Sequence, residues 1–429
     1  MTHRRLLLLA TTTGYQTRSF GEAAERLGVD VALATDRCTT LEDPWRDRAM
    51  PIRFDDEPGS VAAILAEAAR SPFAGLLAVG DRPVPIAAQA AAALGLPYHS
   101  VDGARAAHNK RLARERLVAA GLPVPWFVCH AVDDSPPGAG GLPFPCVIKP
   151  LVLSGSRGVI RANTPAELQA AHARLAALLQ SREVQALRDP DAGAVLIEGY
   201  IPGEEYAIEG LVEHGHLRVL AIFDKPDPLQ GPFFEETIYV TPSIGDAVRQ
   251  RRIEHAVASA AAALGLRHGP IHAECRVDGD RVFVLEVAAR PIGGLCARAL
   301  RFESGGLQIP LEELLLRHAL GEPSASWARE AEASGVMMIP IPHGGVFRRV
   351  DGLEAARAVH DVTEIHITAK ADQRLIPLPE GASYLGFIFA RAPEPRTVED
   401  ALRDAHARLA FLIDRALTVV SAPRLPTGA

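Results

Sequence analysis

The chain has 429 residues, of which 48% are hydrophobic, with a formal net charge of −7 and a pI near 6.1. This length supports a large core and two to four domains or subdomains. The slightly acidic balance, without any Lys/Arg run interleaved with aromatic residues, excludes a polybasic surface, so we expect no nucleic-acid partner.

The opening sequence, MTHRRLLLLATTTG, places positive charge before leucines, as a secretion signal does. Its apolar run ends at Ala10 and polar Thr11 follows, so we interpret it as a first β-strand. No stretch reaches the roughly 20 apolar residues that span a bilayer. The five cysteines are scattered without C-x-x-C spacing, which argues against a disulfide framework or a zinc knuckle. We therefore expect a cytoplasmic protein without a membrane partner.

Strand-like and helix-like segments alternate up to about residue 105. Alternation at these lengths predicts an N-terminal α/β domain over 1–105, with a parallel sheet covered by helices. The loop after the first strand, TTTGYQT, lacks the G-x-G-x-x-G fingerprint, which disfavours a nicotinamide dinucleotide. The predicted strands cover 4–10, 29–35 and 74–80, and the predicted helices cover 17–28, 59–71 and 84–95.

The chain contains only four lysines beside 41 arginines, so a lysine marks a position where arginine was not used. Lys110 opens a helix-like stretch, and Lys149 ends the strand-like run FPCVIKP directly before the loop LVLSGSRGV. A Pro/Gly-rich connector, 133–143, separates the two lysines. Lysines beside a Gly-containing loop are typical of a nucleotide triphosphate site. The alternative is chance survival of a few lysines in an Arg-biased composition.

Strands follow one another from residue 144 onward, which predicts an antiparallel α+β layer. A hairpin with the turn Asp278-Gly279-Asp280 places Glu274 and Glu286 on neighbouring strands. The predicted strands cover 194–201, 204–215, 216–225, 236–242, 269–279 and 280–290, with a helix over 247–265.

The last section, from roughly residue 334, is predicted to form a small α+β domain. Its short strands are expected at 335–342, 363–370 and 382–392, its helix at 398–417, and a frayed tail at 421–429.

Together these segments resemble the ATP-grasp superfamily, from the N-terminal domain to about residue 320. That family holds ATP between two α+β subdomains, with one lysine from each side of a linker and a flexible loop over the phosphates. The resemblance implies an ATP-grasp domain over 106–333, with a lid subdomain at about 144–200. Lys110 and Lys149 match the two lysines. The matching loop residues are Ser154, Gly155, Ser156 and Gly158.

The string VLIEGYIPGEEYAIEG resembles the family's adenosine segment. The resemblance implies that Glu198, with backbone groups of Tyr200 and Ile201, receives the adenine edge. Glu205, seven residues beyond Glu198, matches the carboxylate that accepts the ribose hydroxyls. Taken alone, each glutamate is more simply a solvated strand end.

Glu274 and Glu286 match the family's metal carboxylates, and hard carboxylate oxygens suit Mg²⁺ or Mn²⁺. His272 is expected on the same face as Glu274. Many family members carry Asn where this chain has Ala288, so the number of metal ions stays open. The alternative is a pair of surface glutamates, which the apolar flanks disfavour.

The string E-x-A-A-R, together with the C-terminal section, is similar to the L-amino-acid ligases, which join two amino acids. The resemblance implies a C-terminal domain over 334–420. Arg290 would hold the acyl phosphate and the oxyanion of the tetrahedral intermediate. Gly293 and Gly294 would either present backbone N–H groups to the reacting carboxylate or only turn the chain.

The segment 223–243 is rich in proline, acidic and aromatic residues, and we interpret it as a lid or substrate loop. Glu235 or Glu236 would pair with a substrate amino group, or else face solvent. Lys225 would reach a phosphate or a substrate carboxylate.

The implied function is an ATP-dependent carboxylate–amine ligase that forms an acyl phosphate, releases ADP and phosphate, and uses amino acids or a related small acid and amine. Lys110 and Lys149 would hold the phosphates, with Arg290 and Lys149 catalytic; a homodimer is expected from the family. One alternative is a biotin-carboxylase-like or nucleotide-precursor ligase. Another is an ATP-binding regulatory protein without turnover, and a dinucleotide-dependent oxidoreductase is disfavoured by the missing glycine fingerprint.

Overall fold

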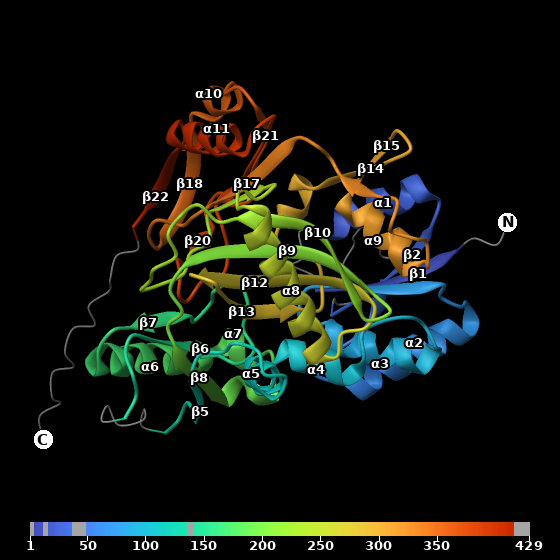
Figure 1. The fold of residues 1–429 in the computed structure, drawn as a ribbon, viewed down its shortest axis with the longest axis horizontal. Helices are drawn as coiled ribbons and strands as arrows, with labels where there is room; N and C mark the ends of the chain where they lie inside the picture. Colours follow the sequence, from blue (N-terminus) through green and yellow to red (C-terminus); the bar gives the residue numbers. More distant parts are fainter. Residues whose placement is uncertain (1–3, 12–15, 37–48, 135–140, 416–429) are drawn as a thin grey trace, which may run out of the picture.

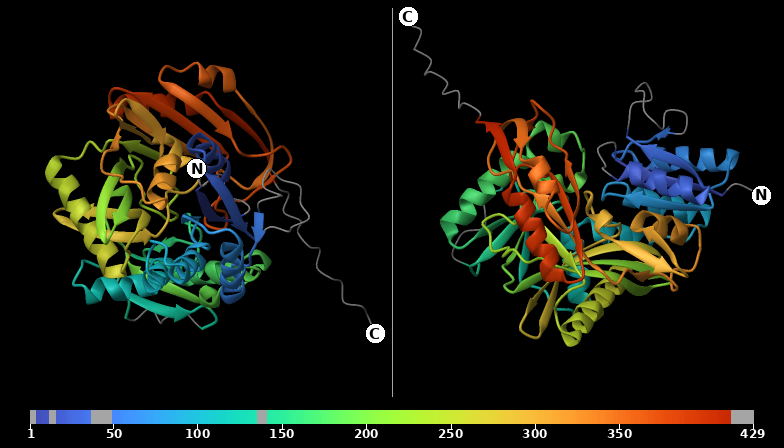
Figure 2. Two further views of the ribbon diagram at one scale, coloured as in Figure 1. Left: turned by 90° about the vertical axis from the view of Figure 1, so that its right-hand side faces the viewer. Right: turned by 90° about the horizontal axis from the view of Figure 1, so that it is seen from above.

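The computed structural model describes residues 4–11, 16–36, 49–134 and 141–415. Most of the loop after the first strand, part of the Pro/Gly-rich connector and the predicted frayed tail lie outside these residues. An α/β domain occupies one end of the molecule, and a small antiparallel subdomain and the C-terminal section lie toward the other (Figures 1 and 2). A large sheet lies between them (Figure 1).

The N-terminal domain is a four-stranded sheet in the order β3-β2-β1-β4, with every pair parallel. The leucines of β1 are fully buried because the sheet lies between packed elements on both faces. The predicted parallel α/β arrangement is therefore confirmed. The elements are β1 (Arg5–Ala10), α1 (Thr17–Leu27), β2 (Asp30–Thr35), β3 (Ala49–Pro51), α2 (Glu57–Arg70), β4 (Gly75–Val79), α3 (Val84–Leu94) and α4 (Val101–His108).

A second, antiparallel sheet of order β5-β8-β6-β7 contains the strands of the predicted lid subdomain at about 144–200 together with β5, which precedes it, and a helix packs against this sheet. Lys110 is the first residue of the helix that precedes the sheet, and Lys149 lies on β6, one of the two central strands. The elements are α5 (Lys110–Ala119), β5 (Phe127–Ala131), β6 (Cys146–Pro150), β7 (Ile160–Ala162), α6 (Pro165–Leu179), α7 (Arg182–Gln185), the 3₁₀ turn Pro190–Gly193 and β8 (Ala194–Gly199).

The largest sheet has eight antiparallel strands in the order β13-β12-β9-β10-β11-β17-β21-β19. It runs through the predicted boundary near residue 334, because β11 pairs with β17 from Ile238↔Met337 to Thr241↔Ser334. The C-terminal section thus extends the sheet that carries Glu274 and Glu286. The elements are β9 (Glu204–Glu213), β10 (His216–Asp224), β11 (Ile238–Thr241), α8 (Ala247–Leu264), β12 (Gly269–Asp278), β13 (Arg281–Ala288), β17 (Ala333–Ile339), β19 (Val362–Ile367) and β21 (Gly386–Ala392).

The predicted helix over 398–417 is wrong in its second half. Helix α11 (Pro395–Ala407) ends before residue 410, and β22 (Ala410–Asp414) pairs with β18 (Gly345–Asp351). Pairing with a strand about sixty residues earlier overrides the local helical pattern. The remaining elements are the 3₁₀ turn Cys296–Ala299, β14 (Arg301–Ser304), β15 (Leu307–Pro310), α9 (Leu311–Ala319), β16 (Ala328–Arg329), α10 (Leu353–Arg357) and β20 (Arg374–Leu375).

Helix α9 brings His318 against a cluster of histidines that lies where β9 ends and β12 begins. The His318 ring stacks on His268 at 4.2 Å between centroids, and its Nδ1 lies 3.3 Å from Glu213. Burial lowers the pKa of His318 to about 4, and the neighbouring His268 ring lowers it in the same direction. Burial also lowers the pKa of the nearby His99 to about 4.

Over the described residues, we find no helix with the length and apolarity to cross a bilayer.

We expect acid to destabilise the protein through these histidines. Their pKa in the unfolded chain is near 6.5, so between about pH 6.5 and 4 the unfolded state binds more protons than the folded state. Their contribution to stability is complete above about pH 6.5 and is lost as the pH falls toward 4. Thermal unfolding midpoints should decrease as the pH is lowered across this range. The decrease should be less steep for His318→Leu than for the wild type. Equal steepness in wild type and variant would contradict the assignment to His318.

Candidate active site

A cavity of about 370 Å³ lies where the N-terminal domain, the lid subdomain, the large sheet and the C-terminal section meet. Its wall brings together side chains from every motif that the sequence analysis singled out. The predicted residues that line it are Lys110, Lys149, Ser154, Gly155, Ser156, Glu198, Tyr200, Ile201, Glu205, Glu236, His272, Glu274, Glu286, Arg290, Gly293 and Gly294.

Three predicted site residues do not line this cavity. Gly158, with φ +75°, packs on α6, where an added Cβ would lie 2.8 Å from Leu175. The burial of Glu235 raises its pKa, and this side chain lies outside the cavity wall. Lys225 is buried behind the lining residues. Its ammonium binds carboxylates and does not face the cavity.

The two predicted phosphate lysines are fixed in different ways. The Lys110 ammonium donates to the Leu153 carbonyl at 2.7 Å, which ties the start of α5 to the loop 151–159, here called the phosphate loop after its predicted role. Lys149 is buried and forms an ion pair with Glu198. Burial lowers the pKa of Lys149 against the opposing effect of Glu198.

Glu198 is bound on both oxygens by cations. Arg114 donates from Nε at 2.8 Å and from Nη2 at 3.2 Å, in addition to the Lys149 contact. Burial alone would raise the pKa of Glu198, but Arg114 and Lys149 outweigh it and lower the pKa to about 2. Glu198 is therefore an ionised carboxylate that organises the two cations beside it.

Two of the backbone groups expected to bind the adenine edge already form hydrogen bonds within the protein. The Tyr200 N–H donates to the Pro145 carbonyl at 3.1 Å, and the Ile201 carbonyl accepts from Arg276 at 2.7 Å. Tyr200 stacks with Phe234 at 6.4 Å between ring centroids, and both rings line the cavity. This part of the wall therefore offers aromatic surface beside backbone hydrogen-bonding groups.

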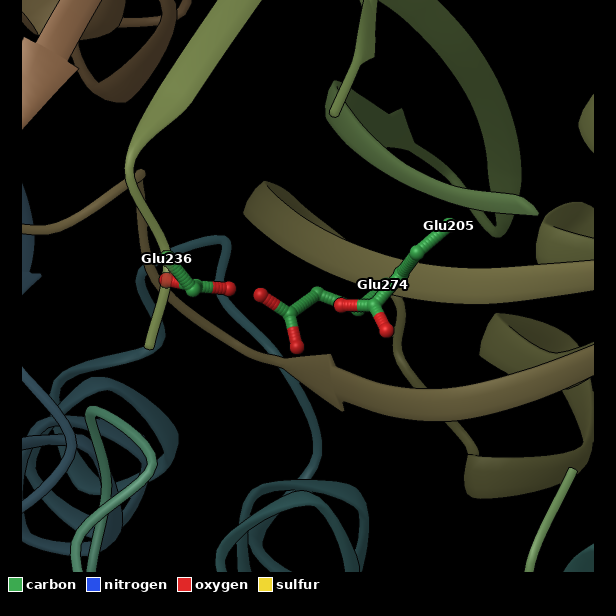
Figure 3. A group of neighbouring side chains, drawn as sticks. All are labelled: Glu205, Glu236 and Glu274. Atoms are coloured by element: carbon green, nitrogen blue, oxygen red, sulfur yellow. The ribbon is translucent and has the colours of Figure 1, made fainter. Parts of the chain in front are cut away.

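Three carboxylates from separate segments converge near Lys225. Glu205 on β9, Glu274 on β12 and Glu236 just before β11 each place an oxygen within 4.8 Å of the others (Figure 3). The Lys225 ammonium binds all three, at 2.8, 2.5 and 2.9 Å for Glu205, Glu236 and Glu274. Burial alone would lower the pKa of Lys225, but the three carboxylates hold it well above its usual value. Burial and Glu274 raise the pKa of Glu236 to about 8.

The strand register places Glu274 directly opposite Glu286. Glu274 uses Oε1 to accept from Lys225 and from Tyr239 at 3.4 Å. Over the described part of the chain, the Glu286 carboxylate has no hydrogen-bond or ion-pair partner, although it faces the cavity. An unpartnered carboxylate beside a second one fits a hard divalent cation such as Mg²⁺.

Arg290 is oriented by a residue that the sequence analysis did not identify. Its Nε and Nη2 donate to the two oxygens of Asp81 at 2.8 and 3.2 Å. Beside it, the fully buried Glu209 accepts from the Ile292 N–H and lies 3.2 Å from His272 Nδ1. This network fixes the turn that leads into Gly293 and Gly294.

The C-terminal section completes the cavity and contacts the phosphate loop. Arg157 Nε donates to the Glu380 carbonyl at 2.7 Å, and the Gly158 N–H donates to the Pro379 carbonyl at 2.8 Å. The other end of the cavity is mostly apolar and aromatic. Its C-terminal lining residues are Met338, Ala382, Ser383, Tyr384 and Phe387.

Comparison with known proteins supports this architecture. The chain matches the ATP-grasp domain family over 142–299, the ATP-grasp N-terminal domain over 21–98 and the L-amino acid ligase C-terminal domain 2 over 337–414. The structure is similar to an L-amino acid ligase from Bacillus licheniformis, with a TM-score of 0.81, 27% identity, and coverage of 97% of this chain and 100% of that one.

Two curated relatives extend the comparison. An uncharacterized protein, y4rH of Sinorhizobium fredii, is 23% identical over 94% of this chain and 82% of its own length. A formate-dependent phosphoribosylglycinamide formyltransferase of Paraburkholderia xenovorans is 29% identical over 63% of this chain and 61% of its own length.

The fold and these matches define the chain as a member of the ATP-grasp superfamily. Within it, the chain is an ADP-forming carboxylate–amine ligase with a C-terminal domain of the L-amino acid ligase type.

Proposed function

We propose that the enzyme joins two amino acids, or a closely related small acid and amine, through an acyl phosphate. The observation that carries this proposal is the single cavity shared by Lys110, Lys149, Glu286 and Arg290 on one side and by the C-terminal section on the other. The matched L-amino acid ligase domain supplies that second side. An apolar end lined by Tyr384 and Phe387 suits a substrate side chain, while the charged end suits phosphates.

In the proposed reaction a substrate carboxylate attacks the γ-phosphate of ATP, and ADP leaves. The amine then attacks the acyl carbonyl, loses a proton, and phosphate leaves. Lys110 and Lys149 would hold the phosphates, and Arg290 would stabilise the negative oxygen that develops on the carbonyl. Mg²⁺ or Mn²⁺ bound by Glu274 and Glu286 would neutralise phosphate charge.

ATP would lie with its adenine beside Tyr200 and Phe234. The Tyr200 carbonyl and the Ile201 N–H are the groups expected to bind the adenine edge. The Tyr200 N–H and the Ile201 carbonyl already form hydrogen bonds within the protein. Glu205 is the proposed acceptor of the ribose hydroxyls. Glu236 is the proposed partner of the substrate amino group, in exchange for part of its contact with Lys225.

Oxygen-18 labelling tests the proposal. We expect purified enzyme with ATP, Mg²⁺ and pairs of amino acids to release phosphate, and a carboxylate labelled with ¹⁸O to transfer one label to that phosphate. Mass spectrometry of the phosphate and of the amide product measures both results. Reactions that lack either the acid or the amine are the controls. Phosphate without label would contradict an acyl phosphate.

A second candidate is a ligase that acts on a nucleotide precursor. The similarity to a phosphoribosylglycinamide formyltransferase favours it. Turnover that depends on formate, bicarbonate or a ribosylamine, and not on amino acids, would support this candidate. Tight ATP binding with no turnover on any substrate would instead favour a regulatory protein.

A further inference from the structure

Asp81 lies outside every sequence motif, yet it lines the cavity. It follows β4 in the N-terminal domain, after Gly80, whose φ of +88° turns the chain at the end of the strand. Both residues line the cavity, and the Asp81 side chain is 22% exposed. The N-terminal domain thus contributes a carboxylate to a site otherwise built by the ATP-grasp and C-terminal sections.

Asp81 fixes the plane of the Arg290 guanidinium. Two of the three guanidinium nitrogens donate to Asp81 side by side, and the third, Nη1, donates to the Pro291 carbonyl at 3.0 Å. A paired, two-point contact defines orientation as well as position. Burial alone would raise the pKa of Asp81, but Arg290 outweighs it and the pKa falls to about 2, so the pair is ionised at neutral pH.

Asp81 also lies near the loop proposed to cover the phosphates. The Ser154 side chain lines the same cavity and helps to lower the pKa of the Asp81 carboxyl. The neighbouring Leu153 carbonyl accepts from Lys110. Asp81 therefore binds the arginine proposed to bind the oxyanion and lines the same cavity as the loop proposed to cover the phosphates.

We propose that Asp81 is a positioning residue: it holds the Arg290 guanidinium in the orientation that the acyl transfer requires. This inference rests on the proposed function, because it assigns Asp81 a role through Arg290. A purely structural ion pair between two domains is the competing explanation.

Asp81→Asn separates these explanations, with Glu67→Gln as the matched control. Glu67 pairs with Arg5 within the same N-terminal domain, and its side chain is also 22% exposed. We expect Asp81→Asn to lower kcat about 10²-fold, as a misplaced catalytic group does, with the KM for ATP within about twofold. The control should leave both unchanged, and both variants should unfold at similar temperatures.

A double-variant cycle shows whether Asp81 acts through Arg290. Asp81→Asn combined with Arg290→Lys should be no slower than Arg290→Lys alone, because the residue to be positioned has been altered. Additive losses would overturn the proposal. So would an Asp81→Asn variant whose kcat equals that of the wild type.

Chemical modification supplies a readout that needs no turnover. Phenylglyoxal should modify Arg290 about tenfold faster in Asp81→Asn than in the wild type, since a neutral amide binds the guanidinium less firmly than a carboxylate does. Peptide mass spectrometry measures this site alone. An unchanged rate would overturn the positioning role. If the wild type forms no ADP with any substrate pair, the proposed function fails while this measurement still reports on Asp81.

Discussion

Glu286→Gln is expected to abolish ADP formation while leaving the folded protein as stable as the wild type. Glutamine keeps the shape of glutamate but removes the anionic ligand, and a metal ion at phosphoryl transfer stabilises charge by several kcal/mol, or about 10³-fold in rate. Because Glu286 has no partner over the described residues, its replacement should not uncover a buried charge. Initial rates of ADP release across a Mg²⁺ titration measure the loss.

Binding of Mn²⁺, followed by electron paramagnetic resonance in the presence of ADP, gives a second measure that does not depend on turnover. Affinity should fall in Glu286→Gln. Glu254→Gln, an exposed position on α8, should match the wild type in both assays. Full turnover by Glu286→Gln would refute the metal assignment.

Lys225→Met is expected to produce the largest loss of stability. The variant removes the cation shared by Glu205, Glu236 and Glu274. Among the described residues, Glu205 keeps Arg276 at 2.7 Å, whereas Glu274 keeps only the more distant His272 at 3.9 Å. Removing one member of a buried ion pair typically costs about 3–5 kcal/mol, because an uncompensated charge stays behind. Urea unfolding at neutral pH measures the change.

The exposed Lys370 provides the matched control, since Lys370→Met should change stability by less than about 0.5 kcal/mol. The double variant Lys225→Met/Glu274→Gln should recover part of the loss, because it removes the carboxylate that stays ionised after its close cation is gone. A single Lys225→Met variant as stable as the wild type would mean that protons, rather than Lys225, neutralise this cluster.

The sequence analysis identified about half of the residues that line the cavity, because short motifs determine them. The segment 195–205 and the hairpin around residue 279 each carry their functional side chains at fixed local spacings. Those residues therefore reach the wall once the strands form. The alternation of the first 105 residues likewise predicted the parallel sheet, since each element follows from its own hydrophobic period.

The pairings within the site could not be predicted in the same way. Arg114 and Glu198 are 84 residues apart, Lys225 and Glu274 are 49 apart, and Arg290 and Asp81 are 209 apart. Such contacts depend on how the domains dock, and no local period encodes that docking. The same cause explains the error at β22, whose partner strand lies far away in the sequence.

The pairing of β11 with β17 limits how enzymes of this design can be recombined. A shuffled gene that exchanges only the segment after residue 334 would replace the last three strands of a continuous sheet, β17, β21 and β19, and the new β17 would have to match Ile238 to Thr241 in register. An exchange that keeps the sheet intact would therefore have to include β11 as well. New substrate preferences should arise more readily by point substitution along the apolar lining than by exchange of the terminal section as a module.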